Sequence, residues 1–194
     1  MEVAVTLVVG YLVGSLPIAG LVARRHGVPD LRAVGDRNPG YWNAKTMLGR
    51  RAALPVFAGD LAKGALAAAV GVALAADGQW WLAYLATGAA MIGHAYPVFA
   101  GFRGGRSVLT FVGGFAVYAP APAAVAGVVL LVVWAATRRF DVAARVGIVA
   151  MPLAQLVLDG PVRTAATGAL MTLIGLRFAQ AARRTGGRAT SDVA

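Results

Sequence analysis

The chain has 194 residues, of which 59% are hydrophobic and 13% charged, and its mean hydropathy is +0.70. Soluble domains contain about 45–50% apolar and about 25% charged residues, so this composition excludes an ordinary soluble domain and predicts an integral membrane protein. The net charge of +10 then predicts basic cytoplasmic loops rather than a nucleic-acid partner. Cysteine is absent and histidine occurs twice, so we expect no disulfide, no metal site and no cofactor.

Apolar runs separated by turn residues predict an all-α bundle of about seven transmembrane helices, because one span needs about 20 apolar residues. A cleaved signal peptide is the alternative for the first run, but its basic residues follow the apolar stretch, which is the wrong polarity. We expect one domain over residues 1–180 and a polar, disordered cytoplasmic tail over 181–194. The expected spans are residues 3–23, 53–76, 80–100, 107–119, 121–137, 142–158 and 161–177.

The basic residues predict the orientation of these spans. If all seven runs cross the membrane, every one of the 18 Lys and Arg residues except Arg163 falls on the same side. By the positive-inside rule that side is cytoplasmic. We therefore expect the N-terminus outside and the C-terminus in the cytoplasm.

Three polar clusters fall on this side although they are far apart in the sequence: the loop 34–46, the stretch 60–64, and residues 94–107. Asp60 and Lys63 share one helix face, so they form either a snorkelling structural ion pair or the lining of a polar cavity. His94 is either a helix-end hydrogen-bonding residue or a residue that contacts substrate.

The stretch Gly104-Gly105-Arg106-Ser107 suits an anion. Glycines let backbone N–H groups turn inward as a nest, a helix N-terminus adds positive potential, and a guanidinium binds phosphate through two hydrogen bonds. A Gly-Gly turn beside a positive-inside arginine is the alternative interpretation. The sequence has no GxSxG, HExxH or Walker motif, so any catalysis must depend on positioning and electrostatics at an anionic substrate.

At these residues the sequence resembles the bacterial acyl-phosphate:glycerol-3-phosphate acyltransferases, the PlsY family. Residues 10–17 are similar to the family's GYLxGSxP, 60–64 to DLLKG, 93–99 to GHxFPVF and 104–110 to GGKGVAT. The resemblance implies a seven-helix protein of the bacterial inner membrane, in contact with membrane lipid. Its implied reaction moves a fatty acyl group from acyl phosphate to the sn-1 hydroxyl of glycerol 3-phosphate, giving lysophosphatidic acid for phospholipid synthesis.

The resemblance also implies a site. We expect Asp36, His94 and Arg106 to be catalytic. We expect substrate to be bound by Arg37, Asn38, Gly40, Asn43, Lys45, Lys63, Gly104, Gly105, Arg106 and Ser107. Gly104, Gly105 and Arg106 would hold phosphate, Lys63 would add positive charge, and the side chains of Asn38, Asn43 and His94 would orient oxygens by hydrogen bonding.

Three segments depart from the family pattern: the first loop, residues 139–146, which lack both serines of the family's RYVSLxSI, and the C-terminal segment. In the first loop, where the family has VGSGNxGATNVLRxLG, Asp36 stands at the Ser position and Trp42 at the Thr position. A carboxylate there should repel an anionic substrate unless Arg37 or Lys45 offsets its charge. The family's C-terminal HxxNI-type segment has no clear match in residues 176–184, where Gln180 is a poor candidate for the functional asparagine.

The sequence leaves three functions open. The first is the acyltransferase reaction, and the second is a catalytically impaired family member that binds lipid or phosphate in the membrane. A small transporter is the third, and it would need a path of polar residues through the outer half of the bundle, which is almost wholly apolar in the sequence.

Overall fold

The computed structural model describes residues 1–189, with the side chains of residues 1–183. Most of this described part is helical and no strand occurs in it, so the prediction of an all-α architecture is confirmed. The helices are α1 (Glu2–Gly14), α2 (Ile18–Arg25), α3 (Tyr41–Leu48), α4 (Arg50–Leu74), α5 (Trp81–Ala95), α6 (Val108–Tyr118), α7 (Pro120–Thr137), α8 (Phe140–Leu158) and α9 (Pro161–Ala189), with short 3-10 turns η1 (Leu31–Ala33) and η2 (Val98–Ala100).

Each expected span coincides with a helix, except that the first is divided between α1 and α2. Pro17 causes the break, because proline has no N–H to donate and its ring clashes with the preceding turn. Four helical stretches of the described chain are long and apolar enough to cross a membrane: α1 with α2, α4, α7 and α8. Helices α5 and α6 are shorter, with 15 and 11 residues, so the exact number of crossings stays a prediction.

Helix α9 extends past residue 180, where we expected a disordered tail to begin. It has 29 residues and runs from Pro161 to Ala189. The disordered tail stays a prediction. Alanine and arginine are frequent over 181–189 and are among the strongest helix formers. The rest of the expected tail, 190–194, lies outside the described residues.

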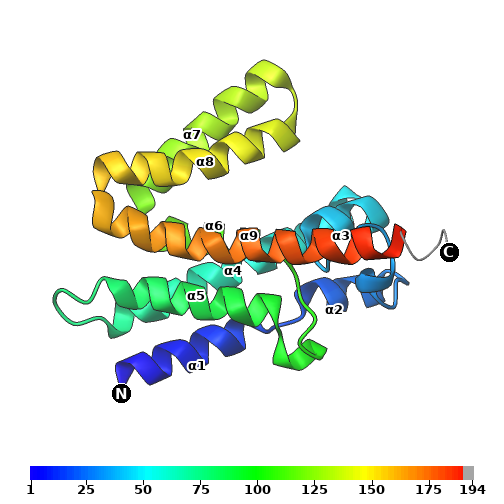
Figure 1. Cartoon of the computed structure of the whole chain (residues 1–194), viewed down its shortest axis with the longest axis horizontal. Coiled ribbons are helices and arrows are strands. Elements are labelled where there is room, and N and C mark those ends of the chain that lie inside the picture. The colour runs from blue at the N-terminus through cyan, green and yellow to red at the C-terminus, as the bar shows by residue number, and fades with distance from the viewer. Residues whose placement is uncertain (190–194) are drawn as a thin grey trace.

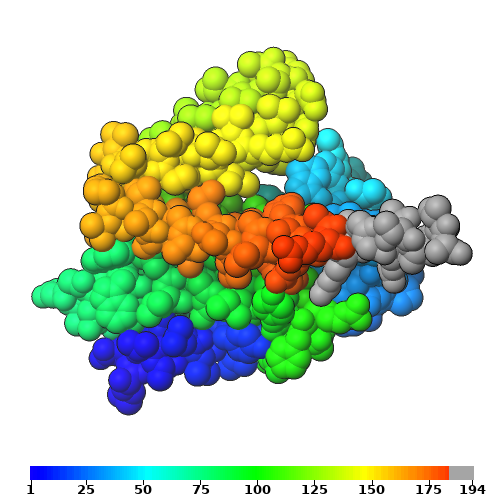
Figure 2. Space-filling model, viewed as in Figure 1, coloured from blue at the N-terminus to red at the C-terminus, as the bar shows by residue number. Residues whose placement is uncertain are grey.

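The polar loops gather at one end of the bundle. Figure 1 shows the N-terminus at one end of the molecule, and the loop after α2, α3, η2 and the end of α9 at the other. The N-terminus and Ala189, the last residue of α9, thus lie at opposite ends. Helices α7 and α8 form a hairpin that stands off from the other helices, and Figure 2 shows an opening between this hairpin and the neighbouring surface.

Close backbone approaches hold α4 against α6 and α1 against α5. A Cβ atom at Gly64 of α4 would overlap the carbonyl oxygen of Thr110 in α6, so only glycine fits at this position. Gly10 and Gly14 of α1, which have the small-xxx-small spacing, lie against the backbone of α5 in the same way. These contacts bring the middle of α4 next to the end of α5, where two of the polar clusters meet.

Another group of polar side chains, Tyr84, Gln155 and Thr167, lies at the opposite end of the bundle, where we expected almost wholly apolar helices. The buried Gln155 of α8 donates to the hydroxyl of Tyr84 in α5 at 2.9 Å and accepts from the hydroxyl of Thr167 in α9 at 2.6 Å. These groups bind one another, so they act as interhelical hydrogen bonds that tie α8 and α9 to α5. They are not the open polar path that a transporter needs.

Candidate functional site

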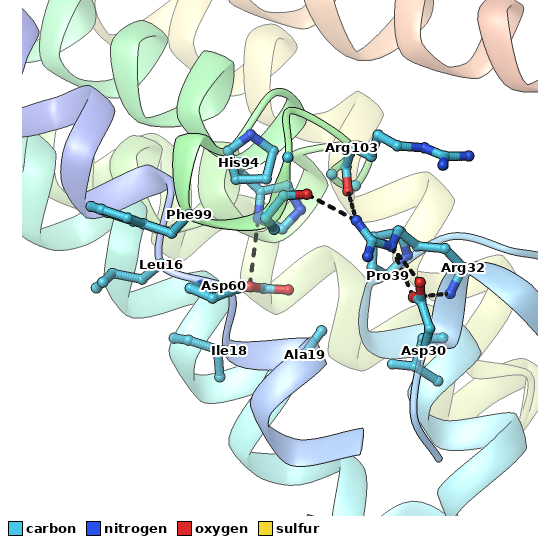
Figure 3. Close-up of a pocket in the computed structure, with 18 of the residues that line it drawn as sticks. Leu16, Ile18, Ala19, Asp30, Arg32, Pro39, Asp60, His94, Phe99 and Arg103 are labelled. Atoms are coloured by element: carbon cyan, nitrogen blue, oxygen red, sulfur yellow. Dashed lines mark hydrogen bonds and ion pairs between the residues drawn. The ribbon is translucent and has the colours of Figure 1, made fainter. Parts of the chain in front are cut away.

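A cavity of about 510 Å³ lies at the end of the bundle where the polar loops gather. The break between α1 and α2, the loop before η1, the middle of α4, the end of α5 and the segment after η2 all contribute to it (Figure 3). One wall is apolar and includes Leu16, Ile18 and Phe99, whereas the floor carries Asp60, Lys63 and His94. The cavity is therefore amphipathic.

The floor is a buried network of three ionisable side chains. Lys63 Nζ donates to Asp60 Oδ1 at 3.0 Å and lies 3.4 Å from His94 Nδ1, which is 3.5 Å from the same Asp60 oxygen. The exposed fractions of Asp60, Lys63 and His94 are 2%, 4% and 8%. Burying an isolated charge is costly, and here each charge has a hydrogen-bonded partner. The ion pair and the cavity lining, which the sequence left as alternatives, are both present, but Asp60 balances the charge that Lys63 brings.

Arg32 forms part of the cavity rim, and sequence reasoning missed it. Its Nε donates to both carboxylate oxygens of Asp30, at 2.8 and 2.9 Å, and its terminal nitrogen donates to the backbone carbonyls of Ala100 and Arg103, at 2.9 and 3.3 Å (Figure 3). This guanidinium holds the pKa of the Asp30 carboxyl below its usual range through its hydrogen bonds. Arg32 thus ties the first loop to the segment after η2, and the Asp-x-Arg spacing was the only signal for it.

Asp36 pairs with Arg106 and not with the two cations that we expected to offset it. The carboxylate oxygen Oδ2 accepts from Arg106 at 3.2 Å, while Oδ1 accepts from the backbone N–H of Asn38 at 3.0 Å. Lys45 instead places its ammonium over the ring of Trp42, 4.5 Å from the centroid. Arg37 is exposed on the loop with a left-handed φ of 59°. The charge of Asp36 is therefore offset by the arginine that we expected to hold phosphate.

Asn43 shapes the first loop. It is buried, and its Nδ2 donates to the carbonyls of Leu31 and Val34 at 2.9 and 3.0 Å, while Oδ1 accepts from the N–H of Asp36 at 3.3 Å. The whole amide is engaged within the loop, which differs from the substrate contact we expected. Gly40 is buried at the start of α3, against the side chain of Asn38.

The expected anion nest is not formed at Gly104 and Gly105. Their N–H groups donate to the carbonyls of Ala95 and His94, at 3.0 and 3.1 Å, and are not free for a ligand. A Cβ atom at either position would overlap the end of α5, so these glycines serve close packing. Ser107 is also structural, because its buried hydroxyl donates to the carbonyl of Met91 at 2.7 Å and its φ is 63°.

Helix α9 contributes two residues that sequence reasoning missed or ranked poorly. Arg177 donates to the carbonyls of Gly104 and Gly105, and Gln180 accepts from Arg177 and from the hydroxyl of Tyr96. Their three-residue separation is that of the His and Asn in the family's HxxNI pattern, and this spacing was the available signal.

The structure thus divides the expected site residues into three groups. Lys63, His94 and the two glycines line the cavity, and Asp36 with Arg106 lies beyond the glycines, outside the cavity lining. The remaining residues belong to the first loop, α3 or the start of α6: Arg37, Asn38, Gly40, Asn43, Lys45 and Ser107. Within the described residues, no three His, Asp or Glu side chains are grouped as metal ligands.

A family model described as glycerol-3-phosphate acyltransferase matches residues 4–186. The chain belongs to this family. A glycerol-3-phosphate acyltransferase of Halalkalibacterium halodurans is 39% identical over 137 residues, which cover 69% of this chain but only 66% of the relative. One of Jannaschia sp. (strain CCS1) is 38% identical over 176 residues, covering 89% of this chain and 83% of the relative.

The fold has a solved counterpart. The crystal structure of PlsY (YgiH), an integral membrane glycerol 3-phosphate acyltransferase, in its glycerol 3-phosphate form, has a TM-score of 0.80 and 29% sequence identity. The match covers 95% of this chain and 92% of that one. The family resemblance in the sequence is confirmed, and the protein is an all-helical, multi-pass membrane member of the glycerol-3-phosphate acyltransferase family.

Proposed function

We propose that this protein is an acyltransferase of the bacterial inner membrane that uses acyl phosphate as the donor and glycerol 3-phosphate as the acceptor. Its products are lysophosphatidic acid and inorganic phosphate. Family membership supports the reaction class, and the acceptor is the molecule named in the glycerol 3-phosphate form of the solved PlsY structure. The donor is inferred from the cavity.

The amphipathic cavity is the observation that carries the proposal. An acyl phosphate has a charged head and an apolar tail, and it needs a site with both characters. Arg24 and Arg103 give the cavity a net positive charge, because Lys63 and Arg32 are balanced by Asp60 and Asp30. Leu16 and Phe99 form part of the apolar wall and are 45% and 57% exposed, so an acyl chain lying along them reaches the lipid.

The reaction requires a held phosphate and a deprotonated hydroxyl. The sn-1 oxygen attacks the acyl carbon, a new ester bond forms, the bond from that carbon to the phosphate oxygen breaks, and inorganic phosphate leaves. We assign Arg106 to the phosphate of the acceptor, since a guanidinium binds it through two hydrogen bonds. Asp36 lies beside Arg106 and takes the hydroxyl proton as general base, and His94 orients the oxygens from the cavity floor.

One observation favours a second candidate function, a family member with impaired catalysis that binds lipid or phosphate. The Asp36 carboxylate occupies a hydrogen-bonding position of Arg106, and the N–H groups of Gly104 and Gly105 are already used. An anion must displace Asp36 to reach that position. A protein of this kind would bind phosphate weakly and transfer no acyl group.

Genetic rescue separates the two functions. The chain is expressed in a bacterium whose own acyl-phosphate-dependent acyltransferase can be switched off, with Arg106→Ala as the inactive control. We expect the wild-type chain to restore growth and labelled phospholipid, and the variant to restore neither. Loss of growth with both chains, although both reach the membrane at equal levels, would support the impaired member.

A further inference from the structure

Two adjacent residues of α9 hold the loop that carries Arg106. Arg177 Nε donates to the carbonyl of Gly105 at 3.1 Å, and its terminal nitrogen donates to the carbonyl of Gly104 at 2.9 Å. The next residue, Phe178, lies under the guanidinium of Arg106, with its ring centroid 4.7 Å from the guanidinium carbon. One helix thus contacts both the side chain of Arg106 and the backbone that precedes it.

Most of the hydrogen-bonding capacity of Arg177 is directed at protein groups. Its third donor contact goes to Gln180 Oε1 at 2.9 Å, and its guanidinium carbon lies 4.7 Å from the centroid of the Tyr96 ring. Three of the five N–H donors of this guanidinium and one of its faces are thus engaged within the protein. The contacts of Arg177 therefore lead to Arg106 through Gly104 and Gly105.

The two hydrogen bonds from Arg177 to the carbonyls of Gly104 and Gly105, called the clamp below, restrain the backbone before Arg106. Two consecutive glycines, the residues with the fewest restrictions on backbone conformation, immediately precede Arg106. Hydrogen bonds to the end of α5 fix their N–H groups, and Arg177 fixes their carbonyls from the opposite helix. The guanidinium also covers two carbonyl oxygens whose partial negative charge would otherwise oppose an anion at Arg106.

Arg106 keeps unused hydrogen-bonding capacity. Its Nε is buried and has no hydrogen-bond partner among the described residues, while a terminal nitrogen donates to Asp36. A phosphate that replaces the carboxylate would bind a guanidinium whose direction is already set by Phe178 and the clamped loop. We propose that Arg177 and Phe178 are positioning residues that aim Arg106 at the phosphate of the substrate. This inference rests on the proposed function, since it takes Arg106 as the phosphate-binding group.

Phosphate binding tests the inference without requiring turnover. The dissociation constants of inorganic phosphate and glycerol 3-phosphate are measured by calorimetry on the full chain in lipid nanodiscs. We expect Arg177→Gln to weaken both by about 10- to 100-fold, because charge-assisted hydrogen bonds contribute about 1.5–3 kcal/mol. Phe178→Leu should weaken both to a smaller extent. The matched control is Arg183→Gln, an exposed arginine further along α9, and it should leave both constants within about twofold.

A double-mutant cycle distinguishes positioning from general loss of structure. In the Arg106→Ala background, Arg177→Gln should change phosphate affinity by less than about twofold, because the residue it aims is gone. If Arg177→Gln changes phosphate affinity equally with and without Arg106, the inference is overturned. It is also overturned if Arg177→Gln leaves phosphate affinity unchanged, or if the wild-type chain binds no phosphate. Arg177→Lys should recover little, since an ammonium cannot bridge two carbonyls as the fork does; full recovery by lysine would contradict the clamp.

The same variants separate this inference from the proposed reaction. If phosphate binding depends on Arg177 but no acyl group is transferred, the inference stands and the acyltransferase proposal fails. If acyl transfer occurs and Arg177→Gln leaves the KM for glycerol 3-phosphate unchanged, the proposal stands and the inference fails. Should Arg177→Gln fail to fold, Phe178→Leu carries the same test, because it leaves the backbone clamp intact.

Discussion

Asp36 and Arg106 lie 70 residues apart in the sequence and meet at 3.2 Å. The Asp36 carboxylate has two opposing effects. It competes with phosphate for Arg106, which weakens substrate binding, and it also lies where a general base is needed for the reaction. Affinity and turnover should therefore respond in opposite directions when the carboxylate is removed.

The first prediction concerns Asp36→Asn. We expect the KM for glycerol 3-phosphate to fall by up to about fivefold, the range of an exposed ion pair. We expect kcat to fall by about 10²-fold or more, the usual contribution of a general base. Steady-state kinetics in lipid vesicles measure both, with Asp30→Asn as control, because Asp30 pairs with Arg32 and not with Arg106. A rise in kcat would show that the carboxylate only repels substrate.

The second prediction concerns the buried pair Asp60 and Lys63. Lys63→Met leaves the Asp60 carboxylate without its Lys63 partner, and we expect the free energy of unfolding to fall by about 3–5 kcal/mol. Denaturant unfolding in mixed micelles measures the change. Lys45→Met is the control, and it should cost less than about 1 kcal/mol, because that ammonium lies over the exposed Trp42. Equal losses for the two variants would contradict the pair's structural importance.

At the scale of the helices, the contact between α4 and α6 places the floor of the cavity. Gly64 follows Lys63 directly and lies against the backbone of Thr110. The third prediction is that Gly64→Ala lowers the free energy of unfolding by about 1–3 kcal/mol, the usual cost of an added methyl group in a packed interior. It should also lower activity, since α4 must move away from α6 and shift Lys63 in the floor of the cavity.

Gly127→Ala on α7 is the matched control for this helix contact. A Cβ atom there meets nothing within 4 Å, so the substitution should leave stability unchanged or slightly raise it through better helix propensity. Thermal unfolding of both variants in one detergent makes the comparison. A Gly64→Ala protein as stable as Gly127→Ala would mean that α4 and α6 do not approach as closely as described.

Sequence reasoning located most helices but did not foresee the hydrogen bonds that several side chains make within the protein, and the cause is physical. Apolar runs predict helices directly, because a segment that crosses the membrane must be both apolar and helical. Pro17 predicts the break in the first run less clearly. Residue type does not predict which partner a side chain hydrogen-bonds. Asn43 and Ser107 are polar residues in motifs that we expected to bind substrate, and both donate hydrogen bonds to backbone carbonyls. Arg32 and Arg177 donate to carbonyls of segments distant in sequence, and the local spacing that marks each arginine does not show these partners.

At the scale of the whole molecule, the charge distribution predicts that the site faces the cytoplasm. The fourth prediction uses the absence of cysteine from the chain. A single cysteine introduced by Asp77→Cys, in the loop after α4, should react with a membrane-impermeant maleimide in intact cells. A single cysteine introduced by Arg139→Cys, in the turn before α8, should react only after the membrane is permeabilised. The opposite labelling pattern would invert the topology and place the site outside.

Acyl transfer by the purified protein tests the central claim most directly. The chain in phospholipid vesicles receives labelled acyl phosphate with and without glycerol 3-phosphate, and the lipid products are separated and counted. We expect labelled lysophosphatidic acid only when glycerol 3-phosphate is present, and a loss of about 10²-fold or more in Arg106→Ala, the usual cost of removing an electrostatic group that stabilises the reacting centre. If the wild-type chain binds glycerol 3-phosphate but forms no labelled lysophosphatidic acid, it is a phosphate-binding family member and not an acyltransferase.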